Sequence, residues 1–317
     1  MSDNFTLLGP SASEAAGRSD ILYLALVGFS TLIAGIFLGV IIWFCFRYRR
    51  NSPADRSNAP SHGGGLEAAW TIAPLLVFLG LFAWAAKYYA EMYRPPADAT
   101  PVFVVGRQWM WKIEHGNGRR EINELHVPID TPVKLVMASQ DVIHSFFVPA
   151  FRQKQDVVPG RYSILWFKAN KEGVYHLLCA EYCGTDHASM IGRVMVMQPQ
   201  DYARWLEEGT SQPGMAQRGF TLFREHGCAG CHSTGSTVHA PLLAGLLGRS
   251  VHLEDGSILV ADETYVHDSI VEPQKQMVAG YAPIMPSFKG QLSEEDIMAI
   301  IEYIRASGDP HTEKQQP

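Results

Sequence analysis

Residues 21–46 read ILYLALVGFSTLIAGIFLGVIIWFCF, and this run contains no charged residue. A second charge-free run extends from residue 68 to residue 86. Each run is close to the ~20 residues that a helix needs to cross the hydrocarbon core of a bilayer. The sequence therefore predicts transmembrane helices over residues 21–46 and 66–90, joined by a short loop over residues 47–65.

The basic residues predict how this hairpin is oriented. The segment over residues 1–20 carries only Arg18, whereas four arginines follow the first apolar run, at Arg47, Arg49, Arg50 and Arg56. Basic loops stay on the cytoplasmic side, so we expect the loop in the cytoplasm and both termini outside, facing the periplasm or an equivalent external space. A cleaved signal peptide would carry its positive charge before a shorter apolar stretch. We therefore expect the hairpin to be retained.

The 317 residues, of which 47% are hydrophobic, leave room for two further domains after the hairpin. Short runs rich in Val, Ile, Phe and Trp predict an all-β sandwich over residues 99–200; examples are Val102 to Val105, Pro132 to Ala138, Tyr162 to Phe167 and Arg193 to Met197. A polar stretch with Gly and Pro over residues 201–213 predicts the remnant of a helix followed by a linker.

The remainder of the chain has the pattern of a helical domain, over residues 214–308. Met215 to Glu225 and Ser293 to Ala306 are predicted helices. In the second, isoleucines recur at helical spacing, and Ser293 with Asp296 resembles a capping box at its start. A polar tail follows over residues 309–317.

A dense set of sulfur and imidazole groups lies in the predicted β domain. Residues 179–190 read CAEYCGTDHASM, which contains Cys179, Cys183, His187 and Met190, and His144 lies upstream. Thiolate and thioether ligands select copper. Two Cys and two His could also hold zinc, which would leave Met190 unused. A single blue-copper site needs only one cysteine, whereas two cysteines four apart could bridge two copper ions.

This pattern strongly resembles subunit II of cytochrome c oxidase, in the haem-copper oxidase family. The resemblance implies a cupredoxin-like domain with a two-copper (CuA) centre. In it Cys179 and Cys183 bridge the ions and His144 and His187 cap them. Met190 is a weak ligand, and the backbone carbonyl of Glu181 is another. In the family the side chain of this glutamate also reaches a magnesium ion shared with subunit I.

Two further positions match the family less fully. Residues 108–111 read QWMW where the family usually has Gln-Trp-Tyr-Trp, so Trp109 would be the ring that receives the electron. An aromatic residue in a strand is also a common packing residue.

Glu67, just before Trp70, matches a glutamate that lies at the cytoplasmic mouth of a proton path in the family. An acidic residue at a helix start is equally favoured by the helix dipole.

Residues 228–232 read CAGCH, the attachment motif of c-type haem, in which Cys228 and Cys231 bond the haem and His232 is the proximal ligand. A methionine as sixth ligand raises the potential. Met285, in an Ile-Met-Pro segment, is the preferred candidate and Met277 the rival. Pro241 and Leu242 are expected to line the pocket. The other histidines of this domain are expected at the surface or in loops; they are His226, His239, His252 and His267. Cys45 is expected to be a small apolar side chain.

The order of the parts resembles oxidases in which an all-α cytochrome c domain is fused to subunit II. The resemblance implies an electron relay from a donor cytochrome or upstream respiratory complex through haem c and copper to haem in subunit I, where oxygen is reduced. Further membrane subunits are expected, and no nucleic acid. A subunit of a copper-containing nitric-oxide reductase and a copper-handling or assembly protein are alternatives. A quinol oxidase fits less well, because its subunit II lacks these copper ligands.

Overall fold

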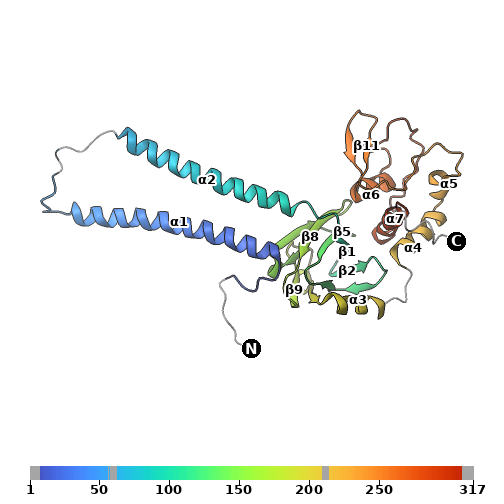
Figure 1. The fold of residues 1–317 in the computed structure, drawn as a ribbon, viewed down its shortest axis with the longest axis horizontal. Coiled ribbons are helices and arrows are strands. Elements are labelled where there is room, and N and C mark those ends of the chain that lie inside the picture. The colour runs from blue at the N-terminus through green and yellow to red at the C-terminus, as the bar shows by residue number, and fades with distance from the viewer. Residues whose placement is uncertain (1–7, 56, 58–62, 209–213, 309–317) are drawn as a thin grey trace.

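The computed structural model describes residues 8–55, 57, 63–208 and 214–308. The predicted tail over residues 309–317 lies outside the described residues, as do part of the predicted linker, part of the first segment and part of the loop of the hairpin. Along the chain come a pair of long helices, a β sandwich and a helical domain (Figure 1). This order agrees with the predicted fold class.

The hairpin consists of α1 (Glu14–Arg47) and α2 (Gly64–Met92). Both helices are long and apolar enough to span a membrane, and their most apolar windows have no buried share. They extend away from the rest of the molecule (Figure 1). Side chains such as Phe37, Leu38 and Phe82 are exposed, as expected of surfaces that face lipid rather than water.

Helix α1 begins before the apolar run, because its first turn packs on the β domain. Ser13 caps this turn by accepting a hydrogen bond from the backbone of Ala16. Ala15 and Ala16 are buried, and the backbone N–H of Ala12 donates to the carbonyl of Ala150 at 2.9 Å. The membrane helix is thus joined directly to the sandwich.

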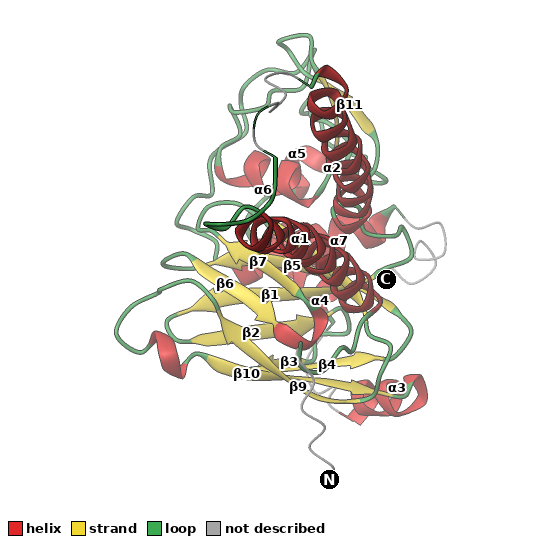
Figure 2. Ribbon diagram, turned by 90° about the vertical axis from the view of Figure 1, so that its left-hand side faces the viewer, coloured by secondary structure: helices red, strands yellow, loops and turns green. Residues whose placement is uncertain are grey.

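The sandwich contains two five-stranded sheets (Figure 2). The first, in spatial order, consists of β3 (Arg120–Ile122), β2 (Met110–His115), β1 (Thr100–Arg107), β5 (Pro132–Ser139) and β8 (Ser163–Lys168). The second consists of β4 (Glu124–Pro128), β10 (Ile191–Met197), β9 (Gly173–Cys179), β6 (His144–Val148) and β7 (Gln153–Val157). Residues from the facing sides form one core, which includes Cys179, Cys183 and Met190.

Strands β1 and β5 are buried on both faces. Val104 and Leu135 point into the sandwich core, whereas their neighbours Phe103 and Val136 belong to a second core shared with the helical domain. Successive side chains of a strand point to opposite faces. An unbroken apolar run therefore needs cover on both sides of the sheet, and the helical domain supplies the outer cover.

The helical domain follows α3 (Pro199–Glu208) and contains α4 (Met215–Glu225), α5 (Ala229–His232), α6 (Glu263–Val271) and α7 (Glu294–Ser307). The predicted capping box of Ser293 and Asp296 is confirmed. Gly219 of α4 packs on the backbone of Ala299 in α7, where a side chain would not fit. A short hairpin of β11 (Ser250–His252) and β12 (Ile258–Val260) was not predicted.

Ion pairs reinforce the contact between the sandwich and the helical domain. Lys134 of β5 lies 2.5 Å from the carboxylate of Glu263. Arg218 of α4 contacts Glu114 of β2 at 3.0 Å, in a part of the interface where both side chains are largely buried. Breaking one partner of a buried pair is costly because the other charge is left uncompensated. The helical domain is therefore docked on the first sheet, in addition to being joined by the chain.

The expectation that His267 lies at the surface or in a loop is wrong. His267 is part of α6 and only 1% exposed, and its ring packs on that of Tyr162 in the sandwich, with centroids 4.7 Å apart. Its Nδ1 lies 3.3 Å from Asp268 and its Nε2 lies 3.5 Å from Glu294. Burial lowers the pKa of His267, but the two carboxylates outweigh burial and raise the pKa above its ordinary value.

Because the pKa of His267 is raised on folding, its contribution to stability is complete below about pH 6.5 and is lost as the pH rises through the folded-state value. We expect thermal stability of the helical domain to fall above this pH, by up to about 1.4 kcal/mol per pH unit. His267→Gln should flatten this dependence, whereas His252→Gln, at an exposed position, should leave it intact. Equal pH profiles in all three proteins would contradict the assignment.

Candidate metal and haem sites

The strands of the second sheet bring the sulfur and imidazole groups together. His144 starts β6, Cys179 ends β9, and Met190 precedes β10. In the loop between β9 and β10, Cys183 follows Cys179, and His187 starts a short 3-10 helix, His187–Ser189. Adjacent strand ends in one sheet place these residues side by side although they are distant in sequence. His144 is fully buried, as is Met190.

The donor atoms form a compact cluster. His144, Cys179 and Cys183 offer ligand atoms that all lie within 4.8 Å of one another. The two Sγ atoms are 3.8 Å apart, well beyond the ~2.05 Å of a disulfide. Cys183 Sγ lies 3.4 Å from His187 Nδ1 and 3.9 Å from Met190 Sδ. The spacing suits two sulfurs that bridge ions rather than bond each other.

The other half of the cluster is built around Cys179. Its Sγ lies 4.0 Å from Nδ1 of His144 and 3.3 Å from the carbonyl oxygen of Glu181. Both imidazoles therefore present Nδ1 to a cysteine sulfur. All six positions proposed from the sequence meet in one place, and the side chain of Glu181 is exposed beside them.

The two thiols differ in their acidity. Burial raises the pKa of Cys179, but the ring of His144 and the backbone of Ser145 outweigh it and bring the pKa to about 6. Burial and the neighbouring Cys179 raise the pKa of Cys183 to about 12. The two thiols therefore titrate as a pair, in which ionisation of one opposes ionisation of the other because adjacent thiolates repel each other.

Asp141 supports the cluster from outside, and the sequence analysis did not single it out. The Nε2–H of His144 donates to Oδ1 of Asp141 at 2.8 Å, which leaves Nδ1 free for a metal. The backbone N–H of Gln108 donates to the other carboxylate oxygen at 2.7 Å. The signal was the Asp-x-x-His spacing, which is common enough to be uninformative without the fold.

Trp109 contacts the loop that carries the cysteines. An added Cβ at Gly184 would lie 3.2 Å from the Trp109 ring and 2.9 Å from Nε2 of Gln108. That amide donates to the carbonyl of Cys183 at 2.8 Å. Gly184 also has φ of +123°, a conformation that favours glycine. Trp109 is thus half-buried against the cluster, whereas Glu67 is exposed in the first turn of α2, far along the hairpin.

The CAGCH segment forms the short helix α5 and its start. The backbone N–H of His232 donates to the carbonyl of Cys228 at 3.0 Å, so that the two cysteines and the histidine share one turn. His232 Nδ1–H donates to the carbonyl of Pro241 at 2.8 Å. This bond fixes the ring and leaves Nε2 free as a ligand. The cysteines are free and half-buried, and burial raises the pKa of Cys228.

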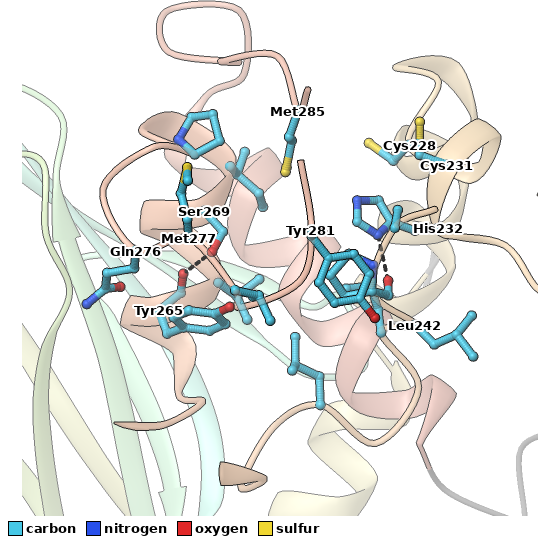
Figure 3. Close-up of a pocket in the computed structure, with 18 of the residues that line it drawn as sticks. Cys228, Cys231, His232, Leu242, Tyr265, Ser269, Gln276, Met277, Tyr281 and Met285 are labelled. Atoms are coloured by element: carbon cyan, nitrogen blue, oxygen red, sulfur yellow. Dashed lines mark hydrogen bonds between the residues drawn. The ribbon is translucent and has the colours of Figure 1, made fainter. Parts of the chain in front are cut away.

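A cavity of about 820 Å³ lies next to this turn, within the size range of cofactor pockets. Its wall includes both cysteines, His232 and apolar side chains of α6 and α7 such as Ile270 and Ile300. Pro241 and Leu242 line it, as predicted. Figure 3 shows the sulfur of Met285 pointing into the space opposite His232, with Met277 on the other side of Met285 from His232. A flat apolar macrocycle fits such a wall.

The remaining histidines of this domain also line the cavity. His226, His239 and His252 are all in its wall. His239 stacks on Tyr281, with ring centroids 4.7 Å apart. These three residues were expected only at the surface or in loops, so their position around the cavity adds to what the sequence indicated.

Fold and site together define a membrane-anchored oxidoreductase subunit that combines a cupredoxin-like domain with a cytochrome c domain. Residues 112–197 match the family "Cytochrome C oxidase subunit II, periplasmic domain", and residues 216–307 match the family "Cytochrome c". The chain belongs to the cytochrome c oxidase subunit 2 family, as subunit II of a haem-copper oxidase with a cytochrome c domain.

Several curated relatives support this membership. The cytochrome c oxidase subunit 2 of Alkalihalophilus pseudofirmus is 29% identical, over 96% of this chain and 91% of its own length. The alternative cytochrome c oxidase subunit 2 of Bradyrhizobium diazoefficiens is 30% identical, over 58% of this chain and 78% of its own length. The cytochrome c oxidase subunit 2 of Cereibacter sphaeroides is 31% identical, over 63% of this chain and 78% of its own length. The first of these matches extends over nearly the whole chain.

Proposed function

We propose that this subunit accepts electrons from an external donor and delivers them to subunit I of a terminal oxidase, where oxygen is reduced to water. A two-copper centre and one covalent haem c, when bound, supply the redox chemistry of this relay. The observation that carries the proposal is the convergence of two thiols, two imidazoles, one thioether and one carbonyl on a single buried cluster.

In this proposal the Sγ atoms of Cys179 and Cys183 and the Nδ1 atoms of His144 and His187 would hold the two copper ions. Met190 and the carbonyl of Glu181 complete the set. The soft donors favour copper over hard cations. Met190 lies 3.9 Å from Cys183, within the cluster, whereas a zinc site of two Cys and two His would not need it. Three of the side chains belong to the packed core, which holds the donors in nearly fixed positions.

In the cytochrome c domain, Cys228 and Cys231 would attach the haem, and His232 would offer Nε2 to its iron. Met285 would be the sixth ligand, because its sulfur points into the cavity, across from His232 (Figure 3). The hydrogen bond to Pro241 orients the proximal ring. The apolar wall excludes water from the cofactor edge, and a thioether ligand raises the reduction potential.

Three further roles belong to the same proposal. Trp109 is the ring that receives electrons, since it contacts the cysteine loop and remains partly exposed. The exposed carboxylate of Glu181 is available for a magnesium ion shared with subunit I. Glu67, exposed at the start of α2, lies at the mouth of a proton path in that partner.

We further propose that α1 and α2 span the bacterial inner membrane, with the sandwich and the cytochrome c domain on the periplasmic side. The arginines after α1 support this orientation. Oxidase subunit I and further membrane subunits then cover part of the exposed hairpin. The donor is a cytochrome or an upstream respiratory complex.

The purified complex tests the function directly. We expect a mixed-valence copper signal in near-infrared and electron paramagnetic resonance spectra, a c-type haem spectrum, and consumption of oxygen in preference to nitric oxide. Absence of the copper signal would defeat the relay, and preference for nitric oxide would assign the chain to a nitric-oxide reductase. Zinc in place of copper would also reject the ligand assignment.

Asp141→Asn tests the support of the copper site. Asparagine keeps the shape of the side chain but removes the negative charge that faces His144. We expect copper affinity to fall about 10–100-fold, as is usual when the hydrogen-bond partner of a ligating histidine is lost. A chelator titration followed by near-infrared absorbance measures it. Asp186→Asn, at an exposed position of the loop that carries Cys183, is the matched control. Equal copper affinities in the two variants would show that Asp141 does not support the site.

A further inference from the structure

A second cavity, of about 500 Å³, lies where the hairpin meets the sandwich. Its wall is formed by the first turns of α1, the last turns of α2, and side chains of β7 and β8. The apolar run of α1 begins, and the apolar run of α2 ends, immediately beside it. With the hairpin across a bilayer, the cavity therefore lies at the level of the lipid headgroups.

Cations predominate in this wall. It contains Arg18, Lys87, Arg94 and Lys168, but only two carboxylates, Glu14 and Glu91. Arg18 pairs with Glu91 at 2.8 Å and Lys168 with Glu14 at 2.9 Å.

These two close pairs leave two cations for a ligand. Lys87 reaches Glu91 only at 4.0 Å and is 79% exposed. Arg94 forms no ion pair with any residue that the structure describes. The positive charge that remains suits a phosphate.

Two polar atoms in the same wall have no hydrogen-bond partner within the part of the chain that the structure describes. Trp166 Nε1 and Gln153 Oε1 are both buried and unbonded among the described residues. Gln153 is only 4% exposed, and its amide nitrogen makes just a long contact, at 3.6 Å, with the sulfur of Met92. Buried polar groups normally have a hydrogen-bond partner. The donor of Trp166 and the acceptor of Gln153 would both be satisfied by a ligand that carries an acceptor and a donor.

We propose that this cavity binds the headgroup of an anionic phospholipid. The phosphate pairs with Lys87 and Arg94 and accepts from the indole of Trp166, while a glycerol hydroxyl donates to Gln153. Apolar wall residues, including Met92 and Phe167, contact the glycerol and upper acyl carbons. A membrane lipid fits better than free phosphate, because the cavity is flanked by two lipid-facing helices. The inference rests on the hairpin spanning the membrane and is independent of the copper and haem assignments.

The test uses the intact oxidase complex, delipidated in detergent and then offered phosphatidylglycerol or phosphatidylcholine with the same acyl chains. Native mass spectrometry counts the bound lipid, and peptide cross-linking reports what lies against Trp166. We expect one phosphatidylglycerol to be retained in preference to phosphatidylcholine. Near a membrane surface each Lys or Arg contributes about fivefold to such affinity, so Lys87→Gln with Arg94→Gln should weaken binding about 30-fold.

Matched variants separate the contributions. Trp166→Phe removes only the indole donor and should also weaken binding, whereas Lys154→Gln, at an exposed position of β7 outside the cavity, should not. Copper and haem spectra should be unchanged in every variant, which shows that the complex is intact. Three results would overturn the proposal: equal retention of both lipids, displacement by millimolar inorganic phosphate, or a segment of another oxidase subunit cross-linked in the cavity.

Discussion

Replacement of Cys183 by serine is expected to abolish the two-copper signal and to lower oxidase turnover by more than about 100-fold. The Sγ atom of Cys183 lies 3.8, 3.4 and 3.9 Å from the donor atoms of Cys179, His187 and Met190. Its replacement therefore removes the sulfur around which these three donors are grouped. Even the outer partners of metal ligands account for about 10–100-fold effects, and a hydroxyl is a poor ligand for copper. Near-infrared and electron paramagnetic resonance spectra measure the centre, and oxygen uptake measures turnover.

The control for this substitution is Cys45→Ser in α1. Cys45 is exposed on the membrane helix and is distant in sequence from both clusters, so the same chemical change there should leave both the spectra and the turnover unchanged. The haem absorbance of the Cys183 variant should also persist, because the haem is attached in another domain. A copper signal that survives Cys183→Ser would refute the bridging role.

The second large effect is expected at Met285. Met285→Leu should remove the sulfur that points into the haem cavity (Figure 3) and so abolish the low-spin haem spectrum. Axial ligands set haem potentials over a range of about 0.8 V, and we expect this change to lower the midpoint potential by about 100 mV or more. A redox titration of the purified complex measures the shift.

Met277→Leu is the matched comparison, since Met277 lines the same cavity. It should preserve the low-spin spectrum and shift the potential little. The opposite pattern, with loss only in the Met277 variant, would transfer the ligand to Met277. Unchanged spectra in both variants would show that neither methionine binds the iron.

The sequence predicted the helices and strands best where one face alone is buried. The bounds of α4 agree with its predicted range, and the isoleucine stripe and capping box located α7 to within a residue at each end. Helix α6 was missed, because Thr, Val and Ile favour strands locally. It forms because Asp262 caps its start and most of its side chains are buried against other elements.

The docking of the two domains was not predicted, although a signal was present. Residues 102–105 read VFVV and residues 135–138 read LVMA, and runs without a polar residue indicate strands that are covered on both faces. The sequence does not say what covers the outer face. Contacts such as Tyr162 with His267 join residues about a hundred positions apart, and no local pattern relates them.

The candidate site was recognised from spacing and residue type, which the chain displays locally in CAEYC and CAGCH. Its supporting groups were not. Asp141 lies only three residues from His144, at a spacing too common to be informative, and Gln108 reaches Asp141 only when strands from different parts of the chain pair. The cavity where the hairpin meets the sandwich has no local signal in the sequence at all. Arg18, Lys87 and Lys168 come from three separate segments, so their shared wall exists only in the folded chain.

The double cover of β1 and β5 has a practical consequence for dissecting the subunit. A fragment cut after α3 would expose the outer stripe of these strands, where Phe103, Val105, Val136 and Ala138 now lie against the cytochrome c domain. A bare apolar stripe of that kind promotes self-association. The copper-binding fragment should therefore be prepared with polar replacements on this stripe, or co-expressed with its helical neighbour, if it is to stay monomeric.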